Sequence, residues 1–195
     1  MRIAIITGST RPGRHSEAVA HWVLDIAQRR RDAEFELVDI AEQGLPMFDE
    51  PLLPSYGQYT HEHTRNWAAK VASFDGYVFV TPEYNHGYPA ALKNAIDFLH
   101  VEWNHKAAGF VSYGGMGGVR SVEQLRVVMG ELHVADVRAQ VALSLFTDFE
   151  KFTVFKPHPR HATEVNALLN QVIAWSRALM PLRSLQTEEF AERIA

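Results

Sequence analysis

Apolar and polar residues follow two different periods along the chain. Five short segments are either apolar throughout or alternate with polar residues, which predicts strands. They cover residues 2–7, 34–40, 76–80, 107–112 and 137–143. Five longer segments place apolar residues three and four positions apart, the spacing of one helix face. They cover residues 16–30, 61–73, 89–99, 119–132 and 163–179.

The predicted strands and helices alternate along the sequence, an order typical of α/β proteins with a parallel sheet. Residues 2–7 are apolar on both faces and predict a buried central strand, whereas residues 137–143 alternate and predict a more exposed fifth strand. We therefore expect a three-layer, doubly wound, five-stranded parallel sheet with strand order 2-1-3-4-5. One domain is expected to span residues 1–195, with Pro181 ending the last helix and residues 182–195 forming a C-terminal tail.

Composition removes several kinds of chemistry. The 195 residues include no cysteine, which excludes disulfides, thiolate metal sites and a cysteine nucleophile. A hydrophobic content of 47% can fill the core of one domain, and a formal charge of −4 gives no overall attraction to nucleic acid. No apolar run approaches the roughly 20 residues of a membrane span, and the first residues lack the pattern of a secretory signal. We expect a cytoplasmic protein that binds neither nucleic acid nor membrane.

Three loops rich in polar residues and glycines each follow a predicted strand and precede a predicted helix. They cover residues 8–16, 82–87 and 112–118. The carboxyl ends of parallel strands meet at one edge of the sheet, where a crevice opens between strands one and three in the 2-1-3-4-5 order. The three loops are therefore expected to form one ligand site.

The first loop has the groups that bind a phosphate monoester. Ser9, Thr10 and Ser16 supply hydroxyls, and Arg11 supplies a guanidinium that can form two charge-assisted bonds. A helix N-terminus follows, with Ser16 expected as its N-cap. The loop has neither the Gly-x-Gly-x-x-Gly pattern of dinucleotide folds nor the Gly-x4-Gly-Lys pattern of nucleoside triphosphatases. The alternative is an ordinary polar turn capped by Ser16.

The second and third loops suit a planar ring with polar edges. Glu83, Tyr84 and Asn85 place a carboxylate, an aromatic face and an amide directly after a buried strand. The glycines of the third loop let the backbone approach a ligand closely, and Tyr113 adds an aromatic contact. Each loop alone also fits a simple turn. In the second loop, Asn85 would support its own backbone and Glu83 would cap the next helix, and in the third the glycines would mark a turn.

Other candidate chemistries find less support. His61, His63, His158 and His161 could suggest a metal, but no third ligand is in register, so solvated surface histidines are the expectation. No Gly-x-Ser-x-Gly motif supports a hydrolytic serine. The four tryptophans are expected in the core or in interfaces.

Three motifs, in this order and spacing, resemble those of the NADPH-dependent FMN reductases, a family with the flavodoxin-like fold. They are Gly8-Ser9-Thr10-Arg11, Pro82-Glu83-Tyr84-Asn85 and Tyr113-Gly114-Gly115. The middle motif is the most specific because the similarity continues through residues 87–97, and the resemblance as a whole ends at about Leu143. Many members have an asparagine soon after the arginine, and Ala18 stands at that position here.

The resemblance implies a bound FMN and a set of contacts to it. The phosphate would lie at Ser9, Arg11 and Ser16, and the isoalloxazine ring against residues 82–85 and 112–115. The cofactor-binding residues expected in this way are Ser9, Thr10, Arg11, Ser16, Pro82, Glu83, Tyr84, Asn85, Ser112, Tyr113, Gly114 and Gly115.

The resemblance also implies an activity. The expected enzyme passes hydride from NADPH to bound FMN, and electrons then go to an acceptor such as a quinone, an azo compound or free flavin. Because the cofactor carries this chemistry, we expect no catalytic side chain and no metal. Family members often form homodimers or homotetramers with the site near a subunit interface, where Tyr88 and Trp103 are candidate contacts.

Two other functions remain open at this point. One is a flavodoxin-like electron carrier that binds FMN without turning over NADPH, although the modest net charge offers little electrostatic steering. The other is a protein that retains the fold without binding flavin, since a fold does not determine a function.

Overall fold

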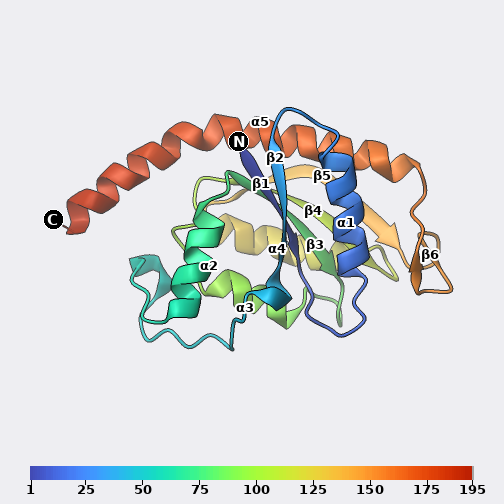
Figure 1. The fold of residues 1–195 in the computed structure, drawn as a ribbon, viewed down its shortest axis with the longest axis horizontal. Helices are drawn as coiled ribbons and strands as arrows, with labels where there is room; N and C mark the ends of the chain where they lie inside the picture. Colours follow the sequence, from blue (N-terminus) through green and yellow to red (C-terminus); the bar gives the residue numbers. More distant parts are fainter. Residues whose placement is uncertain (195) are drawn as a thin grey trace.

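Five parallel strands run through the middle of the molecule (Figure 1). A computed structural model describes the backbone of residues 1–194 and the side chains of residues 1–183. The strands are β1 (Arg2–Thr7), β2 (Glu34–Asp39), β3 (Gly76–Pro82), β4 (Ala107–Gly114) and β5 (Ala135–Ser144). Their order in the sheet is β2-β1-β3-β4-β5, and every pairing is parallel. The predicted strand order is therefore confirmed.

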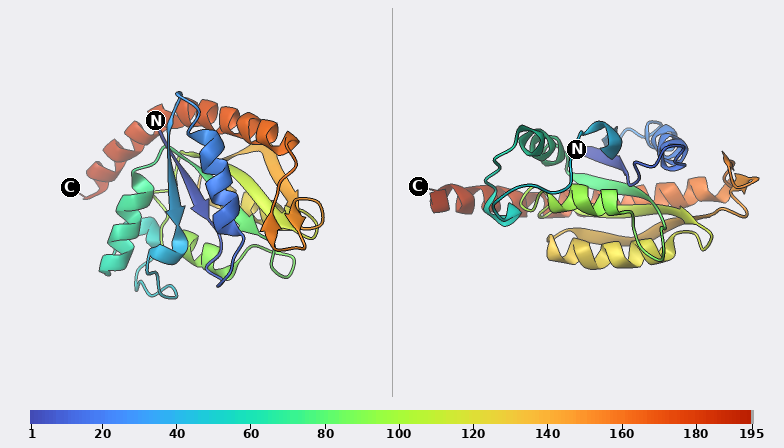
Figure 2. Two further views of the ribbon diagram at one scale, coloured as in Figure 1. Left: turned by 45° about the vertical axis from the view of Figure 1, so that its right-hand side comes forward. Right: turned by 90° about the horizontal axis from the view of Figure 1, so that it is seen from below.

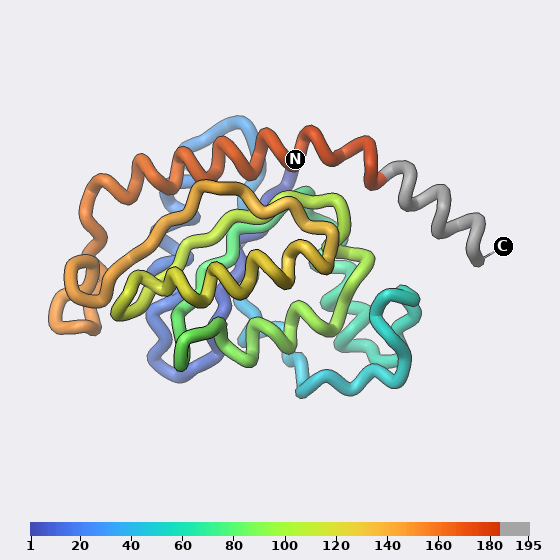
Figure 3. The backbone as a smooth tube through the Cα atoms, turned by 180° about the vertical axis from the view of Figure 1, so that it is seen from behind, coloured from blue at the N-terminus to red at the C-terminus, as the bar shows by residue number. Residues whose placement is uncertain are grey.

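Helices cover both faces of this sheet (Figure 2). They are α1 (Ser16–Ala27), α2 (Glu62–Ala72), α3 (Ala90–Asp97), α4 (Val119–Glu131) and α5 (Arg160–Ile194). Apolar residues of α1 and α5 pack on one face, and those of α2, α3 and α4 pack on the other. Seen from behind, α3 and α4 lie side by side across the second face (Figure 3).

Alternation along β1 shows how the strands serve two cores. Ile3 and Ile5 join the α1 and α5 side, whereas Ala4 and Ile6 join the α2, α3 and α4 side, and all four are buried. Successive side chains of a strand point to opposite faces, so a strand between two helix layers must be apolar at every position. The uniform apolar runs of the sequence thus follow from the three-layer arrangement.

Three short elements complete the fold. Two 3₁₀ helices, η1 (Ile40–Glu42) and η2 (Pro54–Tyr56), lie in the long connection between β2 and α2. A small antiparallel hairpin pairs β6 (Phe149–Glu150) with β7 (Val154–Phe155), and the pattern of the sequence did not predict it. The hairpin projects at one end of the molecule (Figure 2).

Three expectations about helix ends and packing are wrong. The first residue of α1 is Ser16, and its N-cap is His15, so Ser16 is not the cap. Pro181 lies inside α5 and does not end it. The carbonyl that loses its partner to Pro181 belongs to Arg177, which is exposed, so water can satisfy it and the helix continues. Trp103 is buried in the core and donates its Nε1–H to the Ile96 carbonyl, so it is not an interface contact.

The expected tail of residues 182–195 continues α5 as far as Ile194. The side chains of residues 184–194 and the whole of residue 195 lie outside the described part. Among the described residues, no helix is long and apolar enough to cross a lipid bilayer.

Candidate functional site

The three polar loops surround one cavity of about 490 Å³ at the carboxyl edge of the sheet, called the main cavity below. Each loop contributes to its wall, and so does the segment that follows β5. The lining residues are Arg11, Gly13, Arg14, His15, Pro82, Glu83, Tyr84, Tyr113, Gly114, Leu145, Phe152 and Thr153. The predicted convergence of the three loops is therefore observed.

Ser9 connects the first loop to the second. Its side chain is fully buried, and its hydroxyl lies 2.8 Å from the Tyr84 hydroxyl. The Arg11 backbone N–H donates to the Ser9 hydroxyl over 3.3 Å. The bond between Ser9 and Tyr84 therefore holds Tyr84 beside the loop that carries the arginines.

The two arginines of the first loop have different surroundings. Arg14 forms an ion pair with Asp39, which also accepts hydrogen bonds from the Thr7 hydroxyl at 2.7 Å and the Ala41 N–H at 3.0 Å. Burial alone would raise the pKa of Asp39, but these bonds and the Arg14 guanidinium hold that pKa below its ordinary value. Among the described residues, no carboxylate pairs with the exposed Arg11, so its guanidinium is available to an anion at the cavity.

Two hydroxyls meet near the start of α1, each buried and interacting with the other. They belong to Ser16, which is the first residue of α1, and to Tyr113 at the end of β4. Burial raises the pKa of Tyr113 well above 10, so this hydroxyl stays protonated and can donate. No side chain caps α1 at His15, so the first turn also offers its backbone N–H groups and the positive end of the helix dipole.

The second loop is a rigid turn. Tyr84 and Gly87 exchange backbone hydrogen bonds of 2.9 and 3.1 Å, and Asn85 and His86 between them have φ angles of 49° and 73°. Glu83 forms an ion pair with Arg120 at 2.5 Å and also accepts from the Arg120 backbone N–H. Glu83 thereby ties the loop to the first turn of α4.

The third loop bends back against the end of β4. The Ser112 hydroxyl donates to the Gly117 carbonyl over 2.7 Å. Gly118 has a φ of 72°, and a Cβ there would come within 2.8 Å of the Ser112 Cβ and the Tyr113 nitrogen. Only glycine suits that position, because both the backbone conformation and the space exclude a side chain. The bend leaves Gly114 on the wall of the main cavity.

The predicted site residues fall into three groups. Six of them line the main cavity: Arg11, Pro82, Glu83, Tyr84, Tyr113 and Gly114. Ser9, Ser16 and Ser112 are buried in the loops or strands that carry this wall. Thr10, Asn85 and Gly115 are not among the residues that line it.

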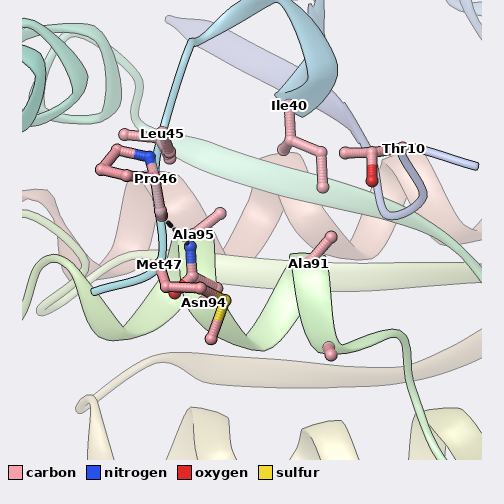
Figure 4. A pocket seen from close by; sticks show the side chains of 9 residues that line it. Thr10, Ile40, Leu45, Pro46, Met47, Ala91, Asn94 and Ala95 are labelled. Atoms are coloured by element: carbon pink, nitrogen blue, oxygen red, sulfur yellow. Dashed lines mark hydrogen bonds between the residues drawn. The ribbon is translucent and has the colours of Figure 1, made fainter.

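Thr10 lines a second cavity of about 320 Å³ on the other side of the first loop (Figure 4). Its other walls are Ile40 and residues 45–47 on one side and the start of α3 on the other. Asn94 of α3 holds the segment of residues 46–48 in place. Its amide N–H donates to the Pro46 carbonyl over 2.7 Å, and its side-chain oxygen accepts from the Phe48 N–H over 2.8 Å.

Six residues that line the main cavity were not predicted as site residues: Gly13, Arg14 and His15, which lie in the predicted first loop, and Leu145, Phe152 and Thr153. The His15 ring packs 5.0 Å from Phe149 and 6.2 Å from Tyr113, measured between ring centroids. Leu145 follows β5 directly, whereas Phe152 and Thr153 lie in the turn of the β6–β7 hairpin, which no glycine or asparagine in the sequence marks. A turn signal there would have indicated the hairpin.

The histidine expectations are partly wrong. His161 is buried, with its Nδ1 2.6 Å from Glu164 and its Nε2 3.1 Å from Asp148, so it is not a surface residue. The His63 Nε2 lies 3.0 Å from the Asp49 carboxylate, and the His61 ring stacks on the His63 ring. The described residues contain no group of three metal-ligating side chains.

Taken together, a doubly wound sheet and a polar cavity at its carboxyl edge define a nucleotide-binding α/β protein of the flavodoxin-like type. The family described as NADPH-dependent FMN reductase matches residues 1–148. The chain belongs to this family, which is a family of FMN-dependent oxidoreductases that use NAD(P)H as electron donor.

Relatives and solved structures agree with this assignment. An NAD(P)H-dependent FMN reductase of Schizosaccharomyces pombe is 46% identical over 149 residues, which cover 75% of this chain and 74% of the relative. The NAD(P)H-dependent FMN reductase LOT6 of Saccharomyces cerevisiae is 40% identical and covers 66% of this chain and 73% of its own length. The flavoenzyme FerB of Paracoccus denitrificans has the same fold, with a TM-score of 0.71 at 18% identity over 91% of this chain and 97% of FerB.

The residues of the main cavity fit the family's cofactor. FMN carries a phosphate monoester and a planar ring with polar edges. The adjoining buried hydroxyls of Ser16 and Tyr113, the uncapped start of α1 and the Arg11 guanidinium are donors that suit a phosphate.

Proposed function

We propose that the main cavity holds FMN with its phosphate at the start of α1. Ser9, Arg11 and Ser16 would contact the phosphate, and residues 82–85 and 112–115 would contact the ring. The exposed guanidinium of Arg11 carries this proposal, because it lines the main cavity, pairs with no described carboxylate and lies in the loop that leads into the uncapped start of α1, where a phosphate is favoured. Thr10 would act from the side of the second cavity, at the edge of the phosphate site.

Bound FMN supplies the redox chemistry, taking electrons from NAD(P)H and giving them to an acceptor. The chain's own residues would bind the FMN and orient its ring. Tyr84 is held by its bond to Ser9, and Pro82 pairs in register with Tyr113, so both walls of the ring site are rigid. Rigid donors already in place lower the reorganisation that a charge developing on the ring would otherwise require.

We propose quinones and azo compounds as the acceptors. A 2-hydroxy-1,4-benzoquinone reductase of a Burkholderia species is 29% identical over 155 residues. An NADPH azoreductase of a Bacillus species is 28% identical over 146 residues. Both acceptors are flat conjugated molecules that take up two electrons, and free flavin is a third acceptor of this kind.

One experiment separates the reductase from its alternatives. The purified protein is loaded with FMN, and its visible spectrum is recorded under anaerobic conditions before and after NADPH is added. We expect a yellow protein that bleaches with NADPH and regains its colour when quinone is added. A yellow protein unmoved by NADPH and NADH would be an electron carrier, and a protein that takes up no FMN would contradict the flavin site itself.

Two further features of the working protein are proposals. We propose that the chain assembles as a homodimer or homotetramer, supported by the exposed apolar side chains of the loop between β2 and α2. We also propose that it works in the cytoplasm, where its electron donor NADPH would be supplied.

A further inference from the structure

Two exposed aromatic rings stand together on the segment that borders the main cavity. Phe152 lines the main cavity and is 54% exposed, whereas Phe146 lines the neighbouring cavity of about 520 Å³ and is 70% exposed. Their ring centroids are 5.4 Å apart, and the planes meet edge to face at 86°. Phe146 also lies above the third loop, because a Cβ on Gly115 would come within 3.8 Å of its ring. The pair, called the aromatic wall below, thus stands beside the predicted ring site.

The tip that carries Phe152 is strained. Lys151 and Phe152 are the central residues of a turn closed by a 3.0 Å bond from the Thr153 N–H to the Glu150 carbonyl, and their φ angles are 51° and 60°. Turns of this kind favour asparagine and glycine, whereas a bulky aromatic residue there is rare and costly. Strain of this sort is retained where a side chain has a task that the favoured residues cannot perform.

The base of the hairpin is firmly anchored, so the exposure of Phe152 does not come from a loose loop. Asp148 is buried and accepts backbone bonds from Ser144 at 2.9 Å and His158 at 3.0 Å. Phe149 is buried 5.0 Å from the His15 ring and 6.1 Å from the Tyr113 ring, measured between centroids. The hairpin therefore rests on the same residues that form the cavity floor.

We propose that the aromatic wall, and Phe152 above all, stacks a planar aromatic acceptor of the quinone class at the main cavity. The proposal rests on the proposed function, since it requires FMN in that cavity. Aromatic rings attract other flat rings in offset or edge-to-face arrangements, and they offer nothing to a small hydrated ion. The family match ends at residue 148, so Phe146 lies inside the matched part and Phe152 outside it, and Phe152 is the residue by which this chain would choose its acceptor.

The test measures binding without turnover. Anthraquinone-2-sulfonate is dialysed against the oxidised FMN-loaded protein in the absence of NADPH, and its dissociation constant is compared among variants. We expect Phe152→Ala to weaken binding about tenfold, and Phe152→Tyr to remain within about twofold of the wild type. In Lys151→Asn, whose side chain lies outside the main cavity, FMN retention and the rate of reduction of ferricyanide, which does not stack, should not change.

Strain supplies a sharper comparison. Phe152→Asn and Lys151→Asn both place a residue suited to positive φ in the same turn, and both should raise the melting temperature. Only Phe152→Asn removes a side chain from the main cavity, because Lys151 faces the neighbouring cavity of about 520 Å³ on the other side of the hairpin. We therefore expect weaker quinone binding from Phe152→Asn and unchanged binding from Lys151→Asn.

The outcomes are distinguishable. Equal quinone binding by Phe152→Ala, Phe152→Asn and the wild type, with FMN retained, would overturn the aromatic wall and leave the reductase intact. A change in oligomeric mass with unchanged quinone binding would identify the wall as a contact between copies of the chain, which also overturns the proposal. Failure of the wild type to take up FMN would contradict the proposed function instead.

Discussion

At the scale of single residues, the buried hydroxyls around the site differ in their partners. Ser9 and Ser112 are bonded to the Tyr84 hydroxyl and the Gly117 carbonyl, as buried hydroxyls in native proteins almost always are to some partner. Ser16 is just as buried, and its hydroxyl interacts with that of Tyr113 at the wall of the main cavity.

Ser16→Ala is expected to affect binding more than folding. The apoprotein should lose at most about 1 kcal/mol in the free energy of unfolding, because only the interaction with the Tyr113 hydroxyl is removed. FMN affinity should fall about tenfold because the phosphate loses a donor. Chemical denaturation of the apoprotein and FMN titration by fluorescence measure the two quantities.

Ser121→Ala is the matched control. Ser121 is equally buried, but its hydroxyl lies 3.1 Å from that of Thr81, away from the main cavity. This variant should lose stability and keep its FMN affinity. If Ser16→Ala behaves in the same way, Ser16 is an ordinary core residue.

Arg11→Ala should weaken FMN binding more strongly. Hydrogen bonds between charged groups contribute about 1.5–3 kcal/mol, which corresponds to roughly 10- to 100-fold in the dissociation constant. Arg11 is exposed and pairs with no described carboxylate, so the fold should be unaffected. Arg29→Ala, an exposed arginine just beyond α1, serves as the control in the same titration. Equal affinity of the Arg11 variant and the wild type would remove Arg11 from the site.

At the scale of elements, the hydrophobic periodicity predicted the strands that are buried between helix layers. It did not predict the β6–β7 hairpin or the continuation of α5 past Pro181, which depend on single contacts. The central strands are apolar runs that must be covered on both faces, as β1 illustrates, and the strand order is that of a doubly wound sheet. The β6–β7 hairpin could not be predicted, because its turn uses Lys151 and Phe152 where turn rules require glycine or asparagine. Pro181 was misread for a related reason: whether a proline ends a helix depends on what can satisfy the freed carbonyl, and a sequence does not show that.

Part of the candidate site was likewise predictable from the sequence, and part was not. The sequence motifs led to the six predicted residues that line the main cavity, since loops after parallel strands must meet at one edge. The partners of those residues were not predictable. Arg14 pairs with Asp39 and Glu83 pairs with Arg120, both across long stretches of sequence that no local pattern connects.

Lys106 shows how two elements depend on one buried charge. It lies just before β4, is 4% exposed, and donates from Nζ to the carbonyls of Val71 and Ala72 at the end of α2. Burial lowers its pKa from 10.5 to about 7, with a further contribution from Arg183, while Asp75 and Glu102 act in the opposite direction. The folded protein therefore binds this proton less tightly than the unfolded chain does.

The sign of the pH dependence follows from that difference. Between about pH 7 and 10 the unfolded chain carries the proton more often than the folded one, so raising the pH stabilises the fold by up to about 1.4 kcal/mol per pH unit. We expect the free energy of unfolding to rise from about pH 7 to 9 in the wild type. Lys106→Met, which keeps the apolar stem, should abolish this rise in urea denaturation at the same pH values. Parallel pH profiles of the two proteins would contradict the buried charge.

At the scale of the whole molecule, the functional features gather at one edge and an apolar surface lies close to them. The connection between β2 and α2 exposes large apolar side chains near the second cavity. They are Met47 (77% exposed), Phe48 (41%), Leu52 (43%), Leu53 (62%) and Tyr56 (55%). The buried carboxylate of Glu50 holds this connection, accepting from the backbone N–H groups of Thr60 at 2.8 Å and His61 at 3.0 Å. An ordered apolar patch of this kind marks an interaction surface.

We therefore predict that this patch is covered by a second copy of the chain. Sedimentation equilibrium of the wild type should give twice the mass of one chain, and Leu53→Glu should shift the protein toward monomer because a charge cannot be buried cheaply in an apolar interface. Val127→Glu is the control, since Val127 is 77% exposed on α4 and lies outside the patch. If the patch also positions the phosphate loop through Thr10 and the second cavity, the Leu53→Glu monomer should bind FMN more weakly than the Val127→Glu protein does. A wild type that stays monomeric at all concentrations would contradict the predicted dimer, and the apolar patch would then bind a different partner. FMN affinity would in that case be independent of protein concentration.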